Sequence, residues 1–399
     1  MARLYLVGTA DTKGEELTYI KAELLAAGQD VVLVDVGTRS PTWPVDVASP
    51  QVAACHPSGA DAVLATDDRG TAVSAMGVAF AAFLSTRTDI AGVIGIGGGG
   101  GTSIVTAGMR MLPIGVPKLM VSTLASGNVS SYVDVSDIVM MSAITDLAGL
   151  NSVSRAVLKQ AAHAIAGMVD AGLPQASEKP SIGLTMFGVT TPCVTQVVEQ
   201  LRPDYDCLVF HATGTGGRTM EKLVDSGLVV GVIDVTTTEV CDHLLGGVLS
   251  AGEDRLGAIA RSGIPYVGSL GALDMVNFGS PETVPDRYAG RNLYRHNPQV
   301  TLMRTSAEEC RRIGRWIADK LNRCTGPVRL LIPEKGVSAL DAPNQPYYDP
   351  QADAALFDSI EDSIVQSEKR TVLRLPYHIN DPDFSTALAF HFREIASRH

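Results

Sequence analysis

The sequence predicts an α/β protein built from two doubly wound domains with mainly parallel sheets. Short runs rich in Val, Ile and Leu recur along the chain with helical patterns between them, which is typical of parallel sheets. A polar, proline-bearing segment at residues 172–180 separates the two halves and is expected to be a linker. We therefore expect one domain over residues 1–175 and a second over residues 181–399.

The first half contains five expected strands and a long closing helix. The helix is predicted at Ser152–Ala171. The strands are expected at Leu4–Gly8, Val31–Val36, Ala91–Ile96, Pro117–Val121 and Asp137–Met141. Because open parallel sheets bind ligands at the carboxyl ends of their strands, the loops after these strands are the places to look for chemistry.

The second half repeats the pattern with seven expected strands. They are predicted at Ser181–Phe187, Tyr205–His211, Val229–Val235, Tyr266–Leu270, Val300–Arg304, Val328–Pro333 and Thr371–Leu375. The same rule directs attention to the loops that follow them.

Composition excludes several classes of function. The formal net charge of -11 argues against binding to nucleic acid or to an acidic membrane surface, both of which require basic surface. The six cysteines are scattered without metal-site or disulfide spacing, and no secretory leader or membrane-spanning run is recognised. We therefore expect reduced thiols and a cytoplasmic location.

The most informative stretch is a run of five glycines, Gly97–Gly101, placed between an expected strand and an expected helix. Glycine leaves backbone N–H groups bare, and a helix start adds unpaired amides and a positive dipole end, so the run predicts an anion site, with phosphate favoured. Gly95, Gly97 and Gly100 fit the dinucleotide pattern, but no acidic residue follows about 20 residues later, and no Walker Lys-Ser or Lys-Thr pair follows either. Tight strand-to-helix packing without any ligand stays open as an alternative.

The loop after the first expected strand, Gly8–Gly14, carries further groups suited to a nucleotide. From charge and ligand chemistry, Asp11 is the expected magnesium ligand and Lys13 the expected phosphate partner. Hydroxyl-rich loops at residues 122–130 and 142–146 follow two later strands. Their hydroxyls also suit helix capping, so the prediction depends on several loops meeting at one crevice.

These segments together resemble the Tm-1-like ATP-binding protein family, typified by a tomato virus-resistance protein. The resemblance extends to residues 268–278 and 378–381 and covers the whole chain. It implies two Rossmann-like domains, of which the first binds ATP with Mg²⁺, and a homodimer. The nucleotide contacts that it implies are Gly8, Thr9, Ala10, Thr38, Arg69, Gly97, Gly98, Gly99, Gly100, Ser122, Thr123, Ser126, Gly127, Ser142, Thr145 and Asp146.

The loops of the second half resemble an active site more than a nucleotide site. The segment His211–Arg218 leaves an expected strand through several glycines and predicts a second anion seat. His211, Asp274 and His378 are the candidate catalytic residues, because histidine beside a carboxylate can move protons near neutral pH. Purely structural hydrogen bonding is the alternative for each histidine.

Three functions fit these observations. The first is a Mg-ATP-dependent enzyme that acts on a small anionic metabolite in a cleft between the domains, with phosphoryl or nucleotidyl chemistry. The second is a regulatory protein that binds ATP without turning it over. The third is a sugar-acid or keto-acid enzyme whose glycine loop binds its substrate and no nucleotide.

Overall fold

The computed structural model describes residues 2–39, 43–172 and 179–397. The chain divides into two compact units, Met1–Gln175 (unit 1) and Ala176–His399 (unit 2), and each is described by itself. Most of the linker expected at residues 172–180, namely 173–178, lies outside the described residues.

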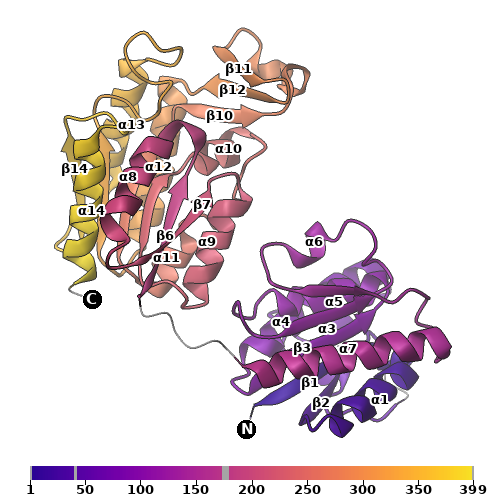
Figure 1. Cartoon of the computed structure of the whole chain (residues 1–399). Coiled ribbons are helices and arrows are strands. Elements are labelled where there is room, and N and C mark those ends of the chain that lie inside the picture. Colours follow the sequence, from indigo (N-terminus) through magenta and orange to yellow (C-terminus); the bar gives the residue numbers. More distant parts are fainter. Residues whose placement is uncertain (1, 40–42, 173–178, 398–399) are drawn as a thin grey trace. The chain divides into compact units, whose positions relative to one another are not determined.

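Unit 1 contains a five-stranded parallel sheet (Figure 1). The strands lie side by side in the order β2-β1-β3-β4-β5. They are β1 (Arg3–Gly8), β2 (Val31–Asp35), β3 (Ile90–Gly97), β4 (Lys118–Ser122) and β5 (Val139–Ser142). Since the order reverses after β1, the gap between the ends of β1 and β3 is the topological switch point of this sheet.

Helices cover both faces of the sheet in unit 1, which explains why its strands are continuous apolar runs. One face packs against α1 (Ala10–Ala26) and α7 (Ser152–Ala171). The other packs against α2 (Ser49–Ala53), α3 (Asp61–Leu64), α4 (Arg69–Ser85) and α5 (Gly99–Met109). A short helix, α6 (Ser130–Val133), follows the loop after β4.

Unit 2 contains a six-stranded parallel sheet in the order β14-β13-β9-β8-β6-β7. Its strands are β6 (Ser181–Met186), β7 (Asp206–His211), β8 (Val232–Thr236), β9 (Tyr266–Gly271), β13 (Val328–Pro333) and β14 (Arg370–Leu375). Counted from β6, this is the strand order of unit 1 with one strand added at the far edge. The predicted fold class, two doubly wound Rossmann-like α/β domains, is therefore confirmed.

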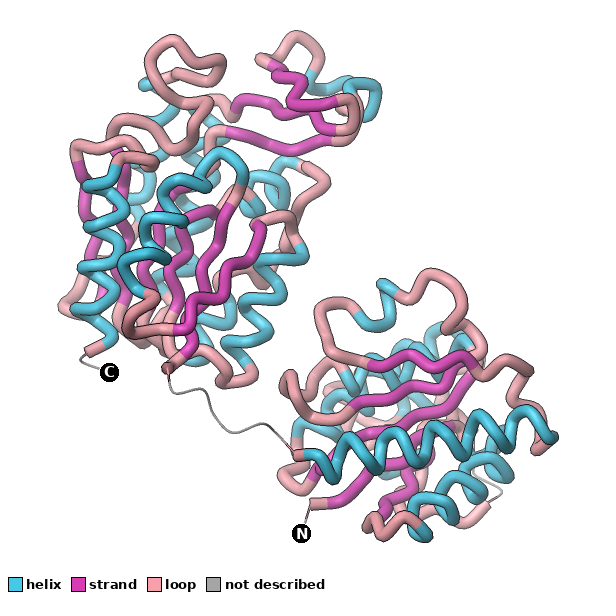
Figure 2. Tube along the Cα trace, viewed as in Figure 1, coloured by secondary structure: helices cyan, strands magenta, loops and turns pink. Residues whose placement is uncertain are grey.

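Helices again form a layer on each face, as Figure 2 shows. One layer consists of α8 (Thr191–Leu201) and α14 (Pro382–Ala396). The other consists of α9 (Thr215–Asp225), α10 (Glu239–Leu245), α11 (Gly257–Ser262), α12 (Ala307–Asn322) and α13 (Pro350–Ser363). Among the residues that the structure describes, no helix is both long and apolar enough to cross a bilayer.

A small antiparallel sheet in unit 2 corrects one prediction. The segment Val300–Arg304, expected as another parallel strand, is β12, which pairs antiparallel with β10 (Met275–Phe278) and β11 (Leu293–Asn297). β11 and β12 follow each other through a tight turn, and this short connection favours an antiparallel hairpin, whereas a parallel pair needs a long crossover. Figure 1 shows this sheet beyond the carboxyl ends of the six-stranded sheet.

Candidate functional site

The candidate site of unit 1 lies at the carboxyl ends of β1 and β3, on the switch point of the sheet. Doubly wound sheets bind ligands at this place because two neighbouring loops diverge there and leave a crevice. The loop after β1 begins at Thr9, and the glycine run leaves β3 at Gly97. The two loops with the strongest nucleotide signals in the sequence therefore follow adjacent strands.

Two glycines at the end of β3 are required by packing. A Cβ on Gly95 would lie 2.4 Å from Cγ1 of Val105, and one on Gly97 would lie 2.9 Å from Cα of Gly101. Both distances are far shorter than carbon atoms tolerate, so these positions allow α5 to pack closely on its own strand.

The next three glycines have no such requirement. A Cβ on Gly98, Gly99 or Gly100 would make only ordinary contacts, at 3.6, 3.7 and 3.5 Å, and none of the three has a positive φ. Within α5, glycine costs about 0.5–1 kcal/mol relative to alanine. Packing within unit 1 therefore does not explain why these three positions at the start of α5 lack side chains.

The start of α5 offers unpaired donors. Gly98 is the N-cap residue and has no side chain to cap the helix, and the first intrahelical bond runs from the N–H of Thr102 to the carbonyl of Gly98 at 2.8 Å. The N–H groups of Gly99, Gly100 and Gly101 have no acceptor inside the helix. Unpaired amides at the positive end of a helix dipole are an arrangement suited to an anion.

Asp35, which no local sequence pattern singles out, holds the first two loops together. Its Oδ1 accepts hydrogen bonds from the N–H of Ala10 at 2.8 Å and of Gly37 at 2.9 Å, and Asp35 is fully buried. Oδ1 of Asp11 approaches the same spot, since a Cβ on Gly37 would lie 3.2 Å from it. A buried acid at the end of β2 was the available signal, but sequence alone does not reveal burial.

Unsatisfied oxygens gather in these loops. In the described part of unit 1, three buried side-chain oxygens lack a hydrogen-bond partner: Oδ1 of Asp11, Oδ2 of Asp35 and Oγ1 of Thr145. Asp35 is the last residue of β2, and Asp11 and Thr145 follow β1 and β5, so all three lie at the carboxyl edge of the sheet. Buried polar groups are normally satisfied, so this concentration points to a ligand, ion or water at the edge.

The two cations expected at this edge, Lys13 and Arg69, have different surroundings. The ammonium of Lys13 donates a hydrogen bond to the carbonyl of Leu147 and so ties α1 to the loop after β5. Arg69 is exposed at the first residue of α4, one turn before Val73, whose side chain lies beside Gly100. Arg69 thus lies at the rim of the glycine run.

The remaining contact candidates follow β1, β2 and β4. Gly8 is buried at the end of β1, and Thr9 bonds Thr12 through their hydroxyls at 2.9 Å. Thr38 is half-buried in the loop after β2. The loop after β4 contains a buried hydroxyl pair, Ser122 with Thr102 at 2.7 Å, a half-buried Thr123 close to Gly98, and the exposed residues Ser126 and Gly127.

The loop after β5 is strained. Ile144 has a φ of 63°, and the N–H of Thr145 bonds the carbonyl of Ala143 across it at 2.7 Å. A β-branched residue in this region costs about 1–3 kcal/mol, and such strain concentrates at functional sites. Ser142 lies half-buried before this turn, and Asp146 accepts from the N–H of Leu147 at 2.8 Å. The turn leaves Ile144 72% exposed.

No cluster of three or more metal-ligating side chains occurs in the described ranges of the chain. Magnesium in nucleotide sites needs only one or two carboxylates, because phosphate oxygens and water supply the other ligands. The unsatisfied oxygen of Asp11 fits that limited role.

In unit 2, the anion seat expected at His211–Arg218 is filled by the protein itself. Oε1 of Glu239 accepts from the N–H groups of Gly214 at 2.7 Å and Gly217 at 3.0 Å. Oε2 of Glu239 accepts from the buried Arg255 at 2.8 Å, and a Cβ on Gly217 would lie 2.0 Å from that oxygen. These glycines accommodate an internal carboxylate.

The three candidate catalytic residues do not form one group. His211 ends β7 and His378 follows β14, at opposite edges of a six-stranded sheet about 24 Å wide at 4.8 Å per strand step. Asp274 and His378 do meet at Ser338, which donates to Asp274 at 2.6 Å and accepts at its carbonyl from Nε2 of His378 at 2.9 Å. Nδ1 of His378 accepts from the N–H of Asn380, so both ring nitrogens have partners. His211 stacks on Phe187 with 5.2 Å between ring centroids.

The fold and the carboxyl edge of the sheet in unit 1 define a class of protein with two doubly wound domains. The first of these domains has a glycine-rich loop with unpaired amides at its switch point. The chain belongs to the uncharacterised protein family UPF0261, matching the N-terminal domain over residues 2–174 and the C-terminal domain over residues 179–396.

Relatives span bacteria and a plant. A UPF0261 protein of Rhizobium meliloti is 65% identical over the full length of both chains, and one of Clostridium tetani is 45% identical over 97% of each. The ToMV resistance protein Tm-1 of Solanum lycopersicum is 43% identical to the whole of this chain, which spans 56% of that longer protein. The resemblance to the Tm-1-like family is therefore confirmed.

Proposed function

We propose that unit 1 binds ATP together with Mg²⁺ at its switch point. The observation that carries this proposal is that Gly98, Gly99 and Gly100 lack side chains although neither packing nor backbone conformation requires it. A phosphate chain against bare amides at a helix start explains this absence, because any Cβ there would stand between the anion and its donors.

The surrounding groups suit the rest of a nucleotide. Asp11 and the phosphates would share Mg²⁺, and Arg69 at the rim would offset phosphate charge. Leu124 and Ile144, 38% and 72% exposed, would give the base an apolar surface at the same edge. The strain at Ile144 is then the cost of presenting that surface.

We further propose that the chain is an ATP-dependent enzyme acting on a small anionic metabolite, and that it forms a homodimer. Light scattering tests the dimer. A regulatory protein that holds ATP without turnover is the alternative outcome, and a sensitive phosphate-release assay separates the two.

Equilibrium dialysis with labelled ATP tests the binding itself. We expect one saturable site per chain that needs Mg²⁺ for full affinity, with AMP binding far more weakly because it lacks the β- and γ-phosphates. Equal affinity for AMP and ATP would contradict the phosphate-centred arrangement, and no binding of either would end the proposal.

A further inference from the structure

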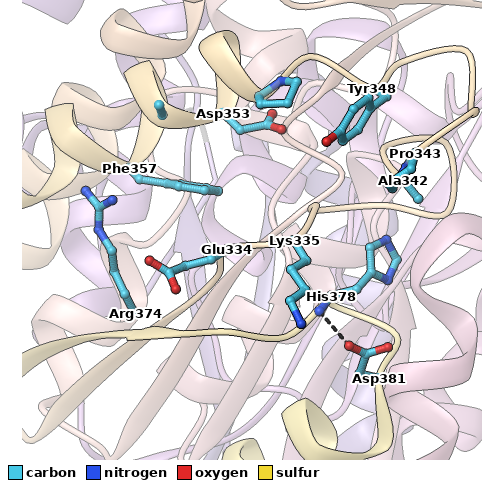
Figure 3. A pocket seen from close by; sticks show the side chains of 12 residues that line it. Glu334, Lys335, Ala342, Pro343, Tyr348, Asp353, Phe357, Arg374, His378 and Asp381 are labelled. Atoms are coloured by element: carbon cyan, nitrogen blue, oxygen red, sulfur yellow. Dashed lines mark hydrogen bonds between the residues drawn. The ribbon is translucent and has the colours of Figure 1, made fainter.

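A second candidate site lies wholly within unit 2. It is a pocket of about 600 Å³ at the carboxyl ends of β13 and β14, closed on one side by the start of α13 (Figure 3). Strand ends are the ligand-binding edge of this sheet as well. The volume suits a metabolite of a few carbon atoms with room for water.

One wall of the pocket is apolar. Phe357 is almost fully buried, whereas Tyr348 keeps 48% of its surface exposed, and Pro343 and Pro350 lie beside them. Figure 3 shows the Tyr348 hydroxyl pointing toward the cavity. Flat rings and prolines of this kind pack against the C–H face of a small carbon skeleton.

The opposite wall carries charges whose partners are missing or incomplete. Within the described residues, neither the ammonium of Lys335 nor the carboxylate of Glu334 has an ion pair or side-chain hydrogen bond. Asp381 accepts from the N–H of His378 at 2.8 Å through Oδ2 only. Arg374 also lines the pocket, but its guanidinium already pairs with Glu361 and Asp358. Among the described residues, the wall therefore offers one unpaired ammonium, that of Lys335, and several oxygen acceptors.

Asp353, which is 6% exposed, also lines the pocket. Its Oδ1 accepts from Nη2 of Arg304 at 2.6 Å, and Asp341 lies 3.9 Å from the same nitrogen. Burial and the neighbouring Asp341 raise the pKa of Asp353 above its ordinary value. A carboxyl group that keeps its proton can donate a hydrogen bond to a ligand oxygen.

We propose that this pocket binds a small polyhydroxy carboxylate, with Lys335 pairing its carboxylate, Glu334 and Asp381 accepting from its hydroxyls, and Tyr348 covering its carbon chain. A phosphate dianion fits less well, because one free ammonium would have to offset two negative charges beside two carboxylates. An uncharged polyol would leave Lys335 without its partner. The ligand class thus follows from the balance of charges in the wall.

This inference deepens the proposed function by naming the class of the anionic metabolite, and it rests on that function only for the role of the ligand as substrate. Binding in unit 2 needs no nucleotide in unit 1. Failure of ATP binding and failure of acid binding are therefore separate results.

Calorimetry on the full chain tests the pocket, with glycerate, threonate and gluconate as probes. Sorbitol, which lacks the carboxylate, and hexanoate, which lacks the hydroxyls, serve as ligand controls. We expect at least one of the three acids to bind saturably, and sorbitol and hexanoate to bind at least about tenfold more weakly.

The variants are Lys335→Gln and Tyr348→Ala, with Lys369→Gln as the matched control at the amino end of β14. Lys335 and Tyr348 are exposed, so both variants should fold, which their melting temperatures will check. We expect Lys335→Gln to weaken acid binding at least about tenfold and Lys369→Gln to leave it unchanged. Absence of binding by all three acids, or equal binding by Lys335→Gln, would overturn the proposal.

Discussion

Replacing Gly99 with aspartate should separate stability from binding in unit 1. The new side chain has space, since a Cβ there would meet only Cδ1 of Leu124 at 3.7 Å. Aspartate forms helices only slightly better than glycine, by a few tenths of a kcal/mol, and a carboxylate in the first turn gains about 0.3–1 kcal/mol from the helix dipole. The variant should therefore be about 0.5–1 kcal/mol more stable than the natural chain.

The same carboxylate would occupy the proposed phosphate seat. We expect calorimetry with Mg-ATP to show an affinity loss of at least tenfold, or about 1.4 kcal/mol. Gly167→Asp is the matched control, because it adds the same charge at a distant helical position. Gly167 lies on α7, and no atom lies within 4 Å of its Cβ position. Unchanged ATP affinity in Gly99→Asp would refute the assignment of the seat. A clear loss of stability would show instead that packing requires the glycine.

Three further predictions concern acidic side chains. Asp35→Ala should destabilise unit 1 by about 2–5 kcal/mol in urea unfolding, because two buried N–H groups lose their acceptor, whereas Asp35→Asn keeps Oδ1 and should cost far less. Glu239→Ala should lower the free energy of unfolding of unit 2 by about 3–5 kcal/mol, whereas the control Glu308→Ala, at an exposed position, should leave it unchanged. Similar stability of the two variants would contradict the role of Glu239 as the anion that fills the glycine loop. The units should also respond oppositely to pH in hydrogen exchange. Burial raises the pKa of Asp242 from 3.8 to about 7, so unit 2 should lose stability as the pH rises from about 4 to 7. In unit 1, the hydrogen bond from Arg3 lowers the pKa of Asp89, so the stability that this bond contributes should be lost on acidification. Parallel pH profiles for the two units would count against these assignments.

Local sequence signals predicted most of the fold. Helix α7 has the predicted bounds, Ser152–Ala171, because its apolar spacing and its asparagine cap are properties of neighbouring residues. The pairing of β10, β11 and β12 was not predictable in the same way. An apolar run such as Val300–Arg304 fits either a parallel or an antiparallel partner, and only the turn that follows β11 decides between them.

The candidate site was predicted as a set of loops, and the meaning of its residues required the structure. The five glycines are indistinguishable in sequence, yet packing requires Gly97 and leaves Gly99 open. The glycines near His211 gave the same signal, although Glu239, more than 20 residues away, fills that seat. Contacts between distant residues decide both cases, and a single sequence does not record them.

In the proposed nucleotide site, the amides at the start of α5 hold a phosphate chain. Glycine-selective ¹⁵N spectra of the full chain, recorded with and without Mg-ATP, test this contact. We expect the N–H signals of Gly99, Gly100 and Gly101 to shift strongly and saturably, while that of Gly167 stays in place. Unmoved signals from the start of α5 at saturating Mg-ATP would contradict it.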